Sequence, residues 1–227
     1  MIRKTALLLA AALASAPALA QVPPRWYAGV SGGQSHTSHE LVANRESTIV
    51  NGASVSTDFD ATDGAWKVFG GWRANPWLAI EVGYADLGRS RLVTHTLSTD
   101  QLEGAVAIRR RISAYGADVL LSAPLGPRFS VFGRGGAYRT RLEADAQLEG
   151  GIVFTNGGED ERSRSTTFDE TVAHFGAGLE WHWRPDASLR VEWERFRDVG
   201  KAFAIGGTGT TGEANTDLAS VGVLLRF

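Results

Sequence analysis

Large apolar side chains alternate with small or polar ones along most of the chain. In the segment WLAIEVGY, residues 77–84, every second residue is bulky and apolar, whereas Glu81 lies in the intervening row with alanine and glycine. Successive side chains of a β-strand point to opposite faces, so this spacing predicts a strand with one apolar and one polar face. Glu81 belongs to the face that bulky residues avoid.

Segments of this kind recur along the chain, and the connections between them alternate in length. Three connections are short and contain RANPW, SAPLGPR and RPDAS, whereas the others are long and polar, near residues 36–64, 88–107, 142–169 and 199–215. Short turns at one rim and long loops at the other are typical of outer-membrane barrels, whose termini are both periplasmic. We therefore predict an all-β fold, an eight-stranded antiparallel up-and-down transmembrane β-barrel, with strands near residues 25–35, 65–74, 77–87, 108–121, 128–141, 170–184, 188–198 and 216–227.

The direction of the apolar rows separates this fold from its alternative, a soluble lipocalin-type barrel. In LRVEWERF, Arg190, Glu192 and Glu194 share one face and the large apolar residues share the other; in FGAGLEWHW, Glu180 and His182 lie opposite an aromatic row. A soluble barrel encloses its bulky apolar residues, whereas a membrane barrel turns them toward lipid and keeps polar groups inside. Charges of both signs on one face indicate a polar interior.

The tryptophans are placed where a membrane interface would lie. All seven fall in the predicted strands or at the short turns, and four of them flank the turns: Trp72, Trp77, Trp181 and Trp183. Aromatic side chains form belts at both membrane interfaces of such barrels. The alternative is that they are ordinary core residues.

The N-terminal sequence predicts export. MIRKTALLLAAALASAPALAQ carries two cations, an apolar stretch and a small-residue cleavage site, so we expect a cleaved signal peptide over residues 1–20 and a barrel domain over residues 21–227. The chain has no cysteine, which excludes a disulfide framework and a lipoprotein anchor. Its net charge of −2 and the absence of a basic stripe argue against nucleic acid as a partner.

Together these segments resemble the OmpA-type transmembrane domain family. FGGWRANPWLAIEVGYADLGR is similar to the second hairpin of that family, FGAGLEWHWRPDASLRVEWERFRDVG to its last hairpin, SVGVLLRF to its final strand and RWYAGVSGG to its first. The resemblance implies a small eight-stranded outer-membrane barrel. Since the sequence ends at Phe227, we expect it to lack the C-terminal peptidoglycan-binding domain of longer members.

The resemblance also implies a lumenal ion-pair network. In the family, a glutamate and an arginine that match Glu81 and Arg190 meet inside the barrel. The full set expected in the interior is Glu81, Arg134, Glu180, Arg190, Glu192 and Glu194. The family's lysine of the fourth strand has no counterpart near Leu120, so we expect an interior rich in carboxylates. Phe227 resembles the terminal aromatic residue that serves as the assembly signal.

The first functional hypothesis is a non-enzymatic structural, envelope-integrity or surface-interaction role through long extracellular loops. Loops on a rigid scaffold are a usual place for binding surfaces, and Asn51-Gly52 predicts a hairpin in the first of them. The expected partners are outer-membrane lipid and lipopolysaccharide, the barrel-assembly machinery and an extracellular ligand, with the barrel itself a monomer and no cofactor. The basic residues suited to lipopolysaccharide phosphates are Arg109, Arg110, Arg111, Arg195 and Arg197.

Two other functions stay open. The lumenal charges suit a narrow low-conductance pore for small solutes, although eight strands leave little free bore. An outer-membrane enzyme that modifies lipid A or cleaves protein is the third hypothesis, with HTSHE, residues 36–40, as its candidate site. Two histidines there, His36 and His39, are too few to define a metal site.

Overall fold

A computed structural model describes residues 25–38, 54–60, 62–97, 103–150, 154–156, 159–161, 163–200 and 214–227. The predicted signal peptide, His39, Glu40 and the Asn51-Gly52 turn lie outside these residues. Within them every regular element is a strand: β1 Arg25–Thr37, β2 Ser54–Asp60, β3 Thr62–Asn75, β4 Leu78–Leu97, β5 Glu103–Pro124, β6 Phe129–Gly150, β7 Phe154–Asn156, β8 Glu159–Glu161, β9 Ser163–His182, β10 Ala187–Val199 and β11 Ala214–Arg226. In the described part of the chain, no helix is long and apolar enough to cross a membrane.

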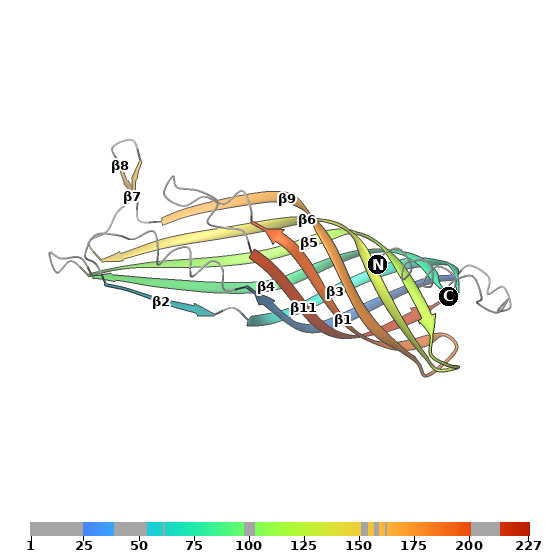
Figure 1. The fold of residues 1–227 in the computed structure, drawn as a ribbon. Coiled ribbons are helices and arrows are strands. Elements are labelled where there is room, and N and C mark those ends of the chain that lie inside the picture. The colour runs from blue at the N-terminus through green and yellow to red at the C-terminus, as the bar shows by residue number, and fades with distance from the viewer. Residues whose placement is uncertain are drawn as a thin grey trace, which may run out of the picture.

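Eight of these strands close into an antiparallel barrel (Figure 1). Each pairs with the strand before and after it in the order β1, β3, β4, β5, β6, β9, β10, β11. The ring closes where β1 pairs with β11, from Tyr27 opposite Arg226 to Thr37 opposite Thr216. The predicted fold class is confirmed, and all eight predicted strands are present.

Short turns join β3 to β4, β5 to β6 and β9 to β10 at one rim of the barrel. The first turn is held by Asn75, whose side-chain oxygen accepts hydrogen bonds from the backbone N–H groups of Trp77 and Leu78 at 3.0 and 2.8 Å. Asparagine favours such turns because its side chain can bond to nearby backbone groups. At the same rim, the N–H of Phe227 donates to the carbonyl of Trp26 at 3.0 Å.

At the opposite rim four strands continue beyond the barrel as a sheet extension, formed by residues 87–97, 103–112, 141–150 and 163–173 together with β2 (Figure 1). Pairing of β4 with β5 reaches Leu97 opposite Glu103. Much of the sequence predicted as loops at 88–107 and 142–169 is therefore strand, which corrects that expectation. The prediction failed because these segments lack the continuous bulky apolar row that marks the rest of each strand.

A bulge in β4 marks where the extension leaves the barrel. The register with β5 shifts between Asp86 and Arg89, and Gly88 adopts a positive φ of 80°. Bulges bend a strand and increase its twist. Beyond this point β4 pairs with β2 rather than β3, with Ser54 opposite Leu97. Residues 54–57 of the predicted first-loop hairpin therefore form a ladder with β4.

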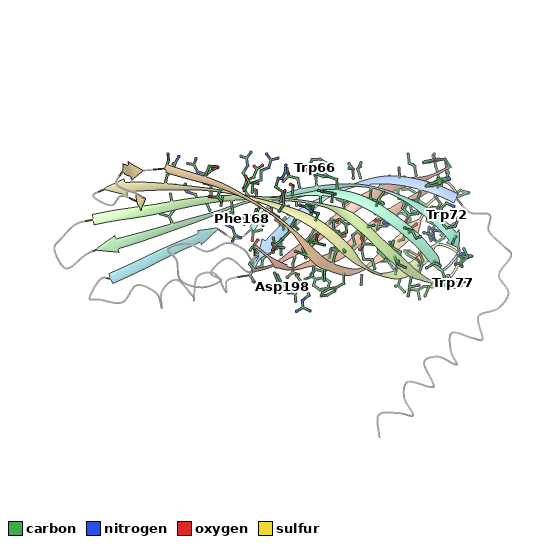
Figure 2. The ribbon with its side chains drawn as sticks, turned by 90° about the horizontal axis from the view of Figure 1, so that it is seen from above. Trp66, Trp72, Trp77, Phe168 and Asp198 are labelled. Atoms are coloured by element: carbon green, nitrogen blue, oxygen red, sulfur yellow. The ribbon has the colours of Figure 1, made fainter. Side chains whose placement is uncertain are left out.

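The outer wall of the barrel is apolar and carries aromatic side chains near both ends. Trp72 and Trp77 lie at the turn end of the barrel, whereas Trp66 lies toward the sheet extension (Figure 2). Phe168 and Asp198 are labelled near the place where the barrel passes into the sheet extension. The ring of Trp66 lies 5.6 Å from that of Tyr84. Two separated aromatic belts with an apolar band between them are the arrangement of a membrane barrel.

Candidate functional site

The interior of the barrel holds a continuous network of charged side chains. Glu81 on β4 is fully buried and lies near its centre. Its Oε2 accepts a 2.7 Å hydrogen bond from Arg190 on β10, and its Oε1 accepts a 2.8 Å bond from Arg134 on β6. The hydroxyl of Tyr27 on β1 donates to Oε2 at 3.0 Å. A buried carboxylate stays ionised only with partners of this kind.

Arg134 contacts carboxylates from three other strands. One terminal nitrogen lies 2.9 Å from Glu192 and 3.0 Å from Glu194, both on β10. The other contacts Glu81 and also Asp118 on β5, the latter at 2.5 Å. The side chain of Arg134 is completely enclosed. A planar guanidinium with five donors can satisfy several carboxylates at once, which a lysine ammonium at this position could not do with the same geometry.

Glu180 forms the end of the network nearest the turn rim. It lies 3.4 Å from Arg190, 3.6 Å from Arg73 and in direct contact with Arg226. All six residues expected in the interior, Glu81, Arg134, Glu180, Arg190, Glu192 and Glu194, are therefore linked by direct contacts in one network.

Sequence reasoning missed several members of this network. Lys67 on β3 lies 2.5 Å from Glu192 and 2.7 Å from Glu194. Asp118 binds Arg134, the Tyr138 hydroxyl at 3.1 Å and His174 Nδ1 at 2.8 Å. Both belong to the inward rows of their strands, so extending the alternation to residues 65–69 and 116–120 would have found them.

The additional cations change the expected balance of charge. Lys67, Arg73 and Arg226 join Arg134 and Arg190 against the carboxylates. The interior is therefore close to charge-balanced, and the expectation of an excess of carboxylates is wrong. Lys67 on β3 supplies an interior cation that was not predicted from the sequence.

Aromatic rings hold the network in place. The Arg190 guanidinium carbon lies 4.7 Å from the ring centre of Phe69 and 4.9 Å from that of Phe132. Close cation–π contacts favour a desolvated arginine. Gly29 and Gly178 leave room for these rings, because a Cβ there would lie 2.4 Å from Phe69 and 2.5 Å from Phe132. Aromatic rings thus take the space that these two glycines leave free.

Apolar side chains are buried on either side of the charges along the barrel. One cluster, toward the sheet extension, includes Tyr138, Leu142, Phe196 and Leu218. A second, toward the turn rim, includes Tyr27, Phe69, Leu120, Phe132 and Leu224. Eight strands give an interior that side chains can fill. Here apolar clusters lie on either side of the central charges, and Glu180, Arg73 and Arg226 continue the ion pairs to the turn rim.

The other candidate residues lie apart from this network. His36 forms a 3.2 Å hydrogen bond with Thr62, and Ser38 bonds to the backbone of Asn215. Among the described residues, no group of three or more histidines, cysteines or acids is arranged to hold a metal ion. Arg110 is buried, which corrects its assignment to the outward basic set. Phe227 is 77% exposed at the turn rim.

Comparisons with known proteins agree with this architecture. Residues 6–227 match the family described as outer membrane protein beta-barrel domain. Outer membrane protein A of Shigella flexneri is 28% identical, with 99% of this chain and 56% of that protein covered. Outer membrane protein P5 of Haemophilus influenzae is 25% identical, with 88% of this chain and 52% of that protein covered. The chain thus spans about half the length of the curated relatives it matches.

Matches to solved structures are of low sequence identity. The crystal structure of Neisserial surface protein A superposes with a TM-score of 0.46 and 13% sequence identity, covering 89% of this chain and 97% of that one. The family match extends over nearly the whole sequence and coincides with the closed barrel described above. The chain therefore belongs to the family of outer membrane protein β-barrel domains, and its location is the bacterial outer membrane.

Proposed function

We propose that this protein is a non-conducting structural barrel that carries the sheet extension on the outside of the cell, where it contacts other surfaces. The observation that carries the proposal is the filled interior: Glu81, Arg134 and Arg190 are at most 5% exposed and bridge strands on opposite sides of the ring. Ion pairs of this kind close the bore by joining its walls. Both ends of the mature chain and the short turns face the periplasm.

The sheet extension supports the surface-interaction part of the proposal. Its strands keep regular pairing well beyond the barrel, up to Gly104 opposite Gly150 and Gln147 opposite Ser163. A rigid platform of this kind presents side chains with little loss of conformational entropy on binding. The role requires no catalysis.

Ion conductance of the purified, refolded chain in a planar bilayer tests the closed interior. We expect a folded and inserted barrel to give no discrete current steps, while a general porin added to the same bilayer does. Folding is checked independently by heat-modifiable migration on gels. Reproducible cation-selective steps that change on substitution of Glu81 would overturn the proposal in favour of the narrow pore.

Shortening the sheet extension tests its role. Val93 lies opposite Ala107, and Asp145 lies opposite Ser165, so residues 94–106 and 146–164 can each be replaced by Asn-Gly as a two-residue turn. The shortened barrel is expected to insert normally but to lose adherence of intact cells to a plate coated with extracellular matrix. Undiminished adherence, at equal surface abundance, would contradict the surface role.

A further inference from the structure

Outward-facing arginines meet in pairs at the base of the sheet extension. Arg89 on β4 lies directly opposite Arg111 on β5, and Arg91 lies opposite Arg109, with all four side chains exposed. Like charges directly opposite on neighbouring strands repel each other and destabilise the sheet. The two pairs lie on the same face of the sheet, two residues apart, so the repulsion is costly unless anions lie nearby.

The nearby carboxylates compensate these arginines only in part. Arg111 lies 2.6 Å from Asp86. Glu143 and Asp145 on β6 are opposite Arg111 and Arg109 in the register. Within the described part of the chain, however, Arg89 and Arg109 form no ion pair. On the other side of β4, Asp63 accepts a 2.6 Å hydrogen bond from the backbone N–H of Arg89, and Asp60 is opposite Arg91 in the register. The surface is therefore not strongly charged overall, but the guanidinium groups of Arg89 and Arg109 are exposed and can contact an anion.

An apolar groove lies on the outer wall next to this surface. It has a volume of about 650 Å³ and crosses β3, β4 and β5, with Val68, Gly70, Val82, Tyr84, Tyr115 and Ala117 along its outward rows. Gly70 and Ala117 keep its floor low between the larger side chains. The groove opens on the wall of the barrel that faces lipid. The apolar groups that can enter it there are the acyl chains of membrane lipids.

The groove and the arginines are within reach of one lipid molecule. Tyr115, at the upper edge of the groove, is directly opposite Arg139 on β6, whose side chain is 52% exposed and lies 4.0 Å from Asp169. Arg111 precedes Tyr115 on the same strand by four residues, which is about 13 Å of extended chain. Apolar surface below and guanidinium groups above match an acyl chain joined to a phosphorylated headgroup.

We propose that the outward face of β3, β4, β5 and β6 binds one phosphorylated, acylated lipid of the outer leaflet, a lipopolysaccharide. Its phosphates are held by Arg89, Arg109, Arg111 and Arg139, because guanidinium groups form bidentate hydrogen bonds with phosphate oxygens. One acyl chain occupies the groove. This inference rests on the proposed function for the placement of the sheet extension outside the cell. It does not depend on whether the barrel interior conducts ions.

Binding of purified rough lipopolysaccharide to the refolded, fluorescently labelled chain in detergent micelles tests this site. The double substitution R89Q/R109Q is expected to weaken binding about tenfold or more, as loss of charge-assisted contacts should. A117W fills the groove without altering charge and is expected to weaken binding as well. The matched control is R128Q/R184Q, two exposed arginines at the turn rim of the barrel, which should bind as the unaltered chain does.

Two further measurements separate a lipid from other anions. Enzymatically dephosphorylated lipopolysaccharide should bind more weakly than the intact lipid, and A117W should not affect binding of soluble inorganic pyrophosphate. Equal loss in the turn-rim control, or equal binding of the dephosphorylated lipid, would refute the assignment. Pyrophosphate competing as strongly as the lipid for both the unaltered chain and A117W would identify a general polyanion surface instead. The interpretation of these binding results does not depend on whether the barrel conducts ions in the bilayer experiment.

Discussion

Arg190 donates a 2.7 Å hydrogen bond to Glu81 across the interior, joining strands that are not neighbours in the barrel. Both side chains are buried, and Glu81 also binds Arg134. Removing one partner from such a set leaves an uncompensated buried charge, which costs far more than the net gain of forming the pair. The closed interior therefore depends on Glu81.

The substitution E81Q should lower the free energy of unfolding by about 3–5 kcal/mol, the usual cost of breaking a buried ion pair. The measurement is reversible urea unfolding in lipid vesicles, followed by tryptophan fluorescence. V82I, on the adjacent lipid-facing position, is the control and should stay within about 0.5 kcal/mol. Equal stability of the two variants would show that the ion pairs do not hold the interior together.

Tyr27→Phe should have a smaller effect than the loss of Glu81. The substitution removes only the hydroxyl, whose 3.0 Å bond to Glu81 is one of several that this carboxylate accepts. We expect a loss of about 1–2 kcal/mol, because hydrogen bonds to charged groups are stronger than neutral ones but two arginines remain. Tyr84→Phe on the outer wall is the control in the same unfolding assay. If Tyr84→Phe lowers the free energy of unfolding as much as Tyr27→Phe does, the hydroxyl of Tyr27 makes no special contribution to stability.

The sequence predicted the barrel because lipid and the interior impose opposite demands on alternate residues. That rule found Glu81, Glu192 and Glu194, and it applies equally to Lys67 and Asp118. Their partners could not be inferred in the same way, since contacts such as Lys67 to Glu192 depend on how residues 125 positions apart are brought together by barrel closure. The sheet extension was missed because strands outside the membrane have no lipid-facing apolar row.

Barrel closure itself depends on Gly33, at the seam between β1 and β11. A Cβ at this position would lie 1.9 Å from the carbonyl oxygen of Ala219, whereas a Cβ at the adjacent Gly32 would meet no atom within 4 Å. Gly33→Ala should therefore cost about 1–3 kcal/mol through overpacking and reduce the yield of folded barrel. Gly32→Ala is the matched control and should fold normally on heat-modifiability gels. Equal yields would mean that the seam can shift to admit a methyl group.

The sheet extension offers a test of electrostatics outside the membrane. Arg141 Nε donates to Asp169 Oδ1 at 2.9 Å, and this hydrogen bond holds the pKa of Asp169 below its ordinary value. Because the carboxylate form is favoured in the folded state, the contribution of the pair is present above the unfolded-state pKa. It is lost as the pH falls through the lower, folded-state pKa.

A carbon-13 NMR titration of the Asp169 carboxyl group in lipid nanodiscs measures this shift directly. The midpoint should lie below about 3.9, the reference for an unperturbed aspartate. Arg141→Gln should move it upward, toward that reference, whereas Arg91→Gln, on a strand that does not pair with β6 or β9, should leave it in place. Because the pair is largely solvated, its removal should leave barrel stability nearly unchanged. A midpoint that is the same in the unaltered chain and in Arg141→Gln would show that the hydrogen bond does not persist in solution, and that the extension is held by its backbone ladder alone.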